Sequence, residues 1–93
     1  MKTIIIAPSF AAGVEACKEI GVGPWDRYTC IATPRVASWR NFQLGVGDRI
    51  FEHVSVASSP ACRQIIAFFK TLALQAGDLK PEWKVIGDPE LWS

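Results

Sequence analysis

The sequence is poor in the residues that build metal and thiol sites. It contains a single histidine, His53, and three cysteines at positions 17, 30 and 62, with no CxxC pair. A zinc site takes about four closely spaced Cys, His or carboxylate ligands, so we expect no metal site and no cofactor. Each cysteine falls within an expected helix or strand, where a reduced thiol packs as a small apolar side chain. Reduced cysteines are typical of a cytoplasmic protein.

A strong excess of one charge and a long apolar run are also missing. Ten Lys and Arg face nine Asp and Glu, whereas nucleic-acid-binding domains usually carry a concentrated basic excess. Nucleic acid is therefore a less favoured partner. The apolar run near the amino terminus ends at Pro8-Ser9, far short of the ~18 residues of a membrane span or the ~7 of a signal-peptide core. We expect no membrane partner.

The common catalytic and phosphate-binding motifs are absent. The segment Ala7–Glu15 lacks the Lys and hydroxyl of a P-loop, and of the dinucleotide-binding glycines only Gly13 is present. Gly13 lies on the apolar face of the expected helix, where it favours close packing on a strand. His53 has no nucleophile or carboxylate at a spacing that would indicate a catalytic pair. No HExxH or GxSxG motif occurs. We therefore expect no catalytic residues and a non-enzymatic function.

What the sequence does contain is an alternation of strand and helix patterns. A run of β-branched residues indicates a strand buried on both faces, and Ser9 and Gly21 bound an amphipathic helix as N-cap and C-terminal stop. Ser59-Pro60 is typical of a second helix start. The expected strands are Thr3–Ala7, Tyr28–Ala32 and a half-exposed Arg49–Val56, and the expected helical segments are 9–21, Val36–Phe42 and a long helix to Ala76.

This order predicts a small Rossmann-like α/β domain with βαβ(α)βα topology. Its sheet is expected to have three mainly parallel strands joined by right-handed crossovers. Residues 1–79 form the single domain, and residues 80–93 form a Trp-bearing tail that packs on the domain or on a partner. Within the tail, Trp83–Ile86 can supply a fourth edge strand.

Polar residues follow the expected strands and point to an anion site. Open α/β sheets bind ligands at the carboxyl ends of their strands, and helix N-termini attract anions. Helix caps and turns require the same residue types, so a purely structural role is the alternative. The candidate ligand-binding residues are Ser9, Thr33, Arg35, Arg40, Ser58 and Ser59. Such a site would bind a nucleotide or the phosphates of a nucleic acid.

The long helix has a wide apolar face, and this favours a different function. Its apolar residues span an arc broader than the ~100° that a surface helix commonly buries, and aromatic residues are frequent interface anchors. The alternative is that the tail folds back over this face. The function that we favour is therefore binding to a host protein or to a second copy of the chain. The candidate interface residues are Phe69, Trp83, Val85, Ile86, Leu91 and Trp92.

The order of the expected elements, with three short segments at their ends, also resembles the pattern of a group of small bacteriophage proteins, most of which have no assigned activity. The first is Glu19-Ile20-Gly21 at the helix end, and the second is Trp25-x-x-Tyr28 before the second strand. The third is Leu44-Gly45 followed by Asp48-Arg49-Ile50. These proteins look like an isolated half of a helicase-like core. The resemblance covers residues 2–77 and implies an accessory protein that acts in the bacterial host cytoplasm, without carrying over any functional residue.

Overall fold

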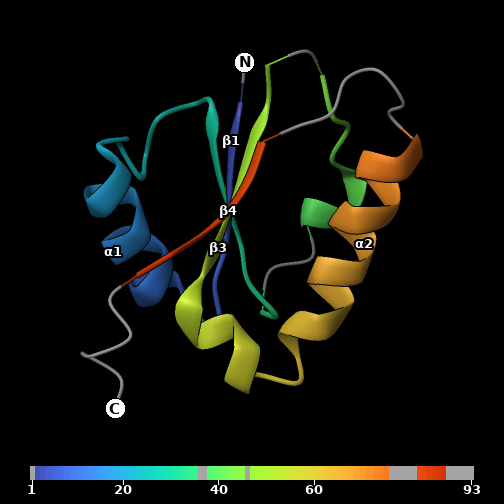
Figure 1. Ribbon diagram of the computed structural model, residues 1–93. Coiled ribbons are helices and arrows are strands. Elements are labelled where there is room, and N and C mark those ends of the chain that lie inside the picture. Colours follow the sequence, from blue (N-terminus) through green and yellow to red (C-terminus); the bar gives the residue numbers. More distant parts are fainter. Residues whose placement is uncertain (1, 36–37, 46, 76–81, 88–93) are drawn as a thin grey trace.

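Four parallel strands form one sheet in the order β2-β1-β3-β4, with a helix on each face (Figure 1). The computed structural model describes residues 2–35, 38–45, 47–75 and 82–87. The strands are β1 Thr3–Ile6, β2 Thr29–Ala32, β3 Arg49–His53 and β4 Glu82–Ile86. The α-helices are α1 Phe10–Ile20 and α2 Cys62–Gln75, and the 3-10 helices are η1 Ser38–Asn41 and η2 Val54–Ser58.

Strand β1 lies at the centre of the hydrophobic core. Thr3 pairs with Thr29 of β2 on one side and with Arg49 of β3 on the other. Ile4, Ile5 and Ile6 are completely buried because side chains of a strand alternate between two covered faces. The triple-isoleucine run therefore forms the doubly covered strand that its pattern predicts.

Each face of the sheet has its own apolar cluster. On the α2 face, the helix packs with η1 and η2 over the sheet, and the cluster comprises Ile4, Ile6, Ala32, Trp39, Ile50, Val56, Cys62, Ile65 and Phe69. On the α1 face, the smaller cluster comprises Ile5, Ala16, Cys17 and Phe51. The crossover from β1 to β2 runs in one direction over the α1 face. The crossovers from β2 to β3 and from β3 to β4 run in the other direction over the opposite face, so all three have the same handedness.

Both predicted boundaries of α1 are confirmed. The hydroxyl oxygen of Ser9 accepts a hydrogen bond from the Ala12 N–H at 3.2 Å, and Gly21 ends the helix in the left-handed conformation with φ 75°. The predicted packing role of Gly13 is also confirmed, since a Cβ there would overlap the Cγ2 methyl group of Ile31 on β2.

The third and fourth strands differ in detail from the prediction. Strand β3 ends at His53 and continues as η2, and it is mostly buried, because β4 pairs along its other edge. The predicted fourth edge strand is present, so the sheet has four strands, all of them parallel. Among the described residues, no helix is both long and apolar enough to cross a membrane.

The predicted start of the second helix is displaced by two residues. Ser59 closes η2 through a hydrogen bond from its N–H to the Val56 carbonyl, instead of capping α2 with its side chain. The carbonyls of Ser59 and Pro60 then accept from Cys62 and Arg63, which is a tight turn before the helix begins.

The contact at Gly13 predicts the effect of one added methyl group. Gly13→Ala gains about 1 kcal/mol of helix propensity, but overpacking a core typically costs about 1–3 kcal/mol. We expect urea denaturation to show a free energy of unfolding lower by about 1 kcal/mol. In an Ile31→Ala background the same substitution should be stabilising. A more stable Gly13→Ala single variant would contradict the packing role.

Candidate anion-binding site

A cavity of about 520 Å³ opens at the carboxyl edge of the sheet, where β1 and β2 end. It is lined by two loops, and its lining residues are Pro8, Ser9, Phe10, Thr33 and Arg35. Three of the six predicted ligand-binding residues thus come together, as the meeting of parallel strand ends predicts. Cavities of about 300–1,000 Å³ are typical of small-molecule sites.

Ser9 places the amino terminus of α1 at this cavity. Its backbone is extended, and its side chain accepts from the Ala12 N–H while its carbonyl accepts from the Gly13 N–H. The first N–H groups of a helix have no partner within the helix, so those of Phe10 and Ala11 remain available at the helix end. The aligned peptide dipoles add a partial positive charge there.

Thr33 supplies a hydroxyl group at the opposite wall. Strand alternation carries its side chain to the α1 face, because Ala32 packs in the α2 cluster. The residue is only 3% exposed, and its carbonyl accepts a hydrogen bond from the Trp39 indole at 3.2 Å. Its hydroxyl has no hydrogen-bond partner among the residues that the structure describes. Among the described residues, the buried side-chain polar atom without a partner is Arg49 Nε, so the Thr33 hydroxyl is accessible from the cavity, where it can meet a ligand oxygen.

Among the described residues that line the cavity, Arg35 is the charged one. Its side chain is exposed, and the one ion pair between described residues joins Lys84 and Glu82 on β4. The guanidinium is therefore not neutralised by a described carboxylate. A helix end, a hydroxyl and an arginine are elements with which proteins commonly bind phosphate or carboxylate groups.

The other three predicted ligand-binding residues do not line this cavity. The Arg40 guanidinium stacks over the Trp39 ring at 5.3 Å, outside the cavity at the carboxyl edge. The Ser58 hydroxyl donates to the Ser55 carbonyl, and Ser59 is used by its backbone to close η2. These serines serve turns and caps, which is the alternative role of such residues.

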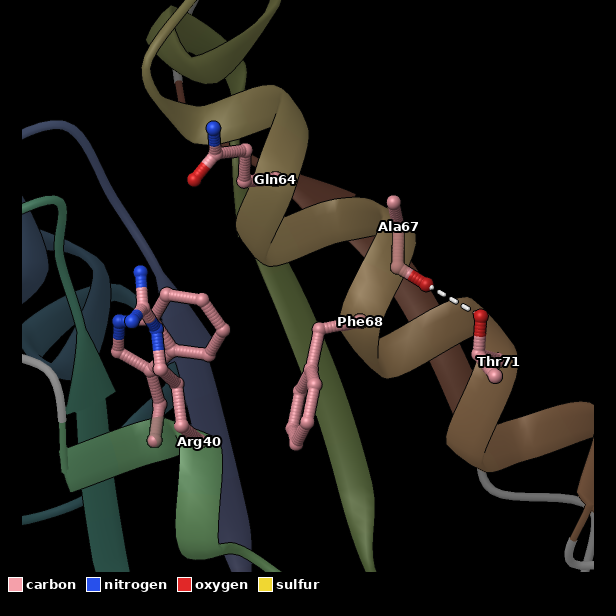
Figure 2. A pocket seen from close by; sticks show the side chains of 6 residues that line it. Arg40, Gln64, Ala67, Phe68 and Thr71 are labelled. Carbon is pink, nitrogen blue, oxygen red and sulfur yellow. Dashed lines mark hydrogen bonds between the residues drawn. The ribbon is translucent and has the colours of Figure 1, made fainter.

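Arg40 instead lies in a second, shallower groove between η1 and α2. Figure 2 shows Arg40 on one side and the α2 side chains on the other. The Phe68 ring forms an edge-to-face contact with Trp39 at a centroid distance of 5.2 Å. The groove has a volume of about 480 Å³ and is lined by Trp39, Arg40, Gln64, Ala67, Phe68 and Thr71.

The predicted interface residues divide between core and surface. Phe69 is completely buried in the α2-side cluster and presents no surface to a partner, whereas the neighbouring Phe68 is half-buried and lines the groove. Trp83 is half-buried, and its indole N–H donates to Glu52 Oε1 at 3.0 Å. Val85 is 62% exposed, whereas Ile86 packs against the α1-side cluster. Leu91 and Trp92 fall outside the described residues.

His53 forms a local pair with Ser55 that sequence reasoning missed. Its Nδ1 accepts from the Ser55 N–H at 3.2 Å and lies 2.6 Å from Ser55 Oγ. The imidazole is buried and caps η2, so the pair fixes the turn after β3. A histidine two residues before a serine at a strand end was the available signal.

Burial makes the thiols poor nucleophiles. It raises the pKa of Cys17 and of Cys30, although the positive charge of Lys2 opposes the change at Cys30. Cys62 is also buried. No group of three or more potential metal ligands occurs within the described part of the chain.

No protein family, curated protein or solved structure matches the chain. The resemblance to small bacteriophage proteins therefore stays a prediction.

The thiol environments predict a slow reaction with Ellman's reagent. At pH 8 we expect the native protein to react roughly tenfold or more slowly than the urea-unfolded chain, because a raised pKa lowers the thiolate fraction. The half-buried Cys30 should react before Cys17 and Cys62. A native thiol that reacts faster than free cysteine would contradict these environments.

Proposed function

We propose that this protein is a non-enzymatic ligand-binding domain that holds an anionic group at the carboxyl edge of its sheet. The observation that carries the proposal is the convergence of three different anion-binding elements on one cavity. These are the α1 amino terminus at Ser9, the partnerless hydroxyl of Thr33 and the guanidinium of Arg35.

The two main donors recognise an anion in different ways. The N–H groups of α1 are held rigidly by the helix, and their charge is a fixed partial charge that cannot be titrated. Arg35 adds a full charge and a planar fork of donors that matches two oxygens of a phosphate or carboxylate. An anion that binds between them exchanges its hydrating water for these oriented donors. The sheet does not need to move for this exchange.

Inorganic phosphate and pyrophosphate should raise the melting temperature at constant ionic strength. At ten times its Kd, a ligand that binds only the folded state stabilises it by about 1.4 kcal/mol, which is roughly 5 °C or more for a chain of this size. We expect Arg35→Ala to remove most of this shift in differential scanning fluorimetry.

Arg40→Ala is the matched control, since Arg40 is equally exposed but lies in the other groove. It should respond to phosphate as the unmodified protein does. An equal loss of the melting-temperature shift in Arg35→Ala and Arg40→Ala would mean that phosphate is attracted non-specifically to positive charge. No shift at millimolar concentrations of either anion would overturn the proposed function.

A contact with a host protein or a second copy is the other candidate function, and the groove at Phe68 favours it. The ring is only partly covered, and Leu74 on the same helix is 84% exposed. If the chain self-associates through this groove, Phe68→Ser should lower the mass measured by sedimentation equilibrium, while Gln43→Ser on an exposed loop should not. A monomer at every concentration would exclude self-association.

A further inference from the structure

An exposed pair of aromatic rings adjoins the anion cavity. Phe10 lines the cavity, and its ring lies 5.1 Å from the Trp25 ring, with the planes tilted by 44°. Trp25 is 81% exposed and Phe10 is 45% exposed. Phe10 and Trp25 therefore form an aromatic platform that continues the cavity wall outward from the helix end.

We propose that the ligand of this site is a nucleoside monophosphate, with its phosphate in the cavity and its base stacked on the platform. This inference rests on the proposed function, because the phosphate would occupy the anion site. A base is a flat, weakly hydrated ring that stacks on aromatic side chains whatever its identity. The platform offers such a surface directly beside the cavity that holds the α1 amino terminus and Arg35, because Phe10 belongs to both.

The size and charge of the site favour a single nucleotide over a longer strand. The cavity of about 520 Å³ has one helix end and one arginine, which suits one phosphate group. A nucleic-acid strand needs a positive track along several phosphates, whereas Asp26 follows Trp25 in the sequence and Glu15 is exposed on α1. The net charge of the chain is only +1.

Phe10 also belongs to both parts of the site, the amino terminus of α1 and the aromatic platform. It is the first residue of α1, so its backbone N–H belongs to the helix end and its side chain belongs to the platform. A ligand that binds the helix end is thereby held within reach of the aromatic surface. The Phe10 and Trp25 contact would anchor the loop before β2 even without a ligand, and the experiment separates these roles.

Calorimetric titration of the full chain with four probes tests the inference. The probes are inorganic phosphate, ribose 5-phosphate, adenosine 5′-monophosphate and adenosine. We expect the monophosphate to bind about tenfold more tightly than ribose 5-phosphate, within the range of base stacking on aromatic residues. Binding should also quench the part of the tryptophan fluorescence that Trp25→Leu removes, since of the three described tryptophans Trp39 is buried and Trp83 is half-buried while Trp25 is open to the ligand.

Trp25→Leu should lower the affinity for adenosine 5′-monophosphate to that for ribose 5-phosphate and leave the latter unchanged. Tyr28→Leu is the matched control, because Tyr28 is an exposed aromatic residue of the same loop whose ring lies against the Arg27 guanidinium, whereas the Trp25 ring contacts Phe10. Phe10→Leu gives a second test if Trp25→Leu fails to fold by circular dichroism.

The outcomes distinguish this inference from the function on which it rests. Equal affinities for adenosine 5′-monophosphate and ribose 5-phosphate would overturn the inference that the ligand is a nucleotide. An equal loss of affinity for both probes in Trp25→Leu would do the same. Either result leaves the proposed anion site intact. Absence of binding by all phosphorylated probes overturns both. Tighter binding of a single-stranded oligonucleotide, with affinity that falls steeply with salt, overturns the single nucleotide in favour of a nucleic acid.

Discussion

The structure depends on burying β1 on both faces. Ile4 and Ile6 face one side and Ile5 the other, and a strand of this kind is stable only if both faces of the sheet are covered. That requirement places α1 and α2 on opposite faces, as Figure 1 shows, and brings β2 and β3 to the two edges of β1. The carboxyl ends of β1 and β2 then meet the start of α1, and the cavity at this edge of the sheet results from that arrangement.

Much of the fold could be predicted because its signals are local. The triple isoleucine, the Ser9 cap and the Gly21 stop each act within one turn or strand. The burial of β3 could not be predicted, because it depends on β4, which pairs with it from far along the chain. The start of α2 was displaced because the tight turns at Ser59 compete with a helix cap, and both use the same residue types.

The site was predictable only where strand ends determine position. Ser9, Thr33 and Arg35 lie in the short loops that follow β1 and β2, and the rule that parallel strand ends meet brings them together. Arg40 follows the buried Trp39, whose indole donates to the Thr33 carbonyl on the α2 face, so η1 carries Arg40 away. Phe68 and Phe69 are neighbours on one apolar arc, and the helix pattern alone does not show which ring the sheet covers.

The all-parallel register has a consequence for how the chain reaches this structure. Residue 3 pairs with residues 29 and 49, and residue 49 pairs with residue 82, so no two strands can join through a hairpin. Each pairing closes a long loop before its contacts stabilise it, and such topologies fold more slowly than local ones. The β1-α1-β2 unit closes the shortest loop and is the natural nucleus. Until β3 pairs with β1, one edge of β1 stays open to pairing with another chain.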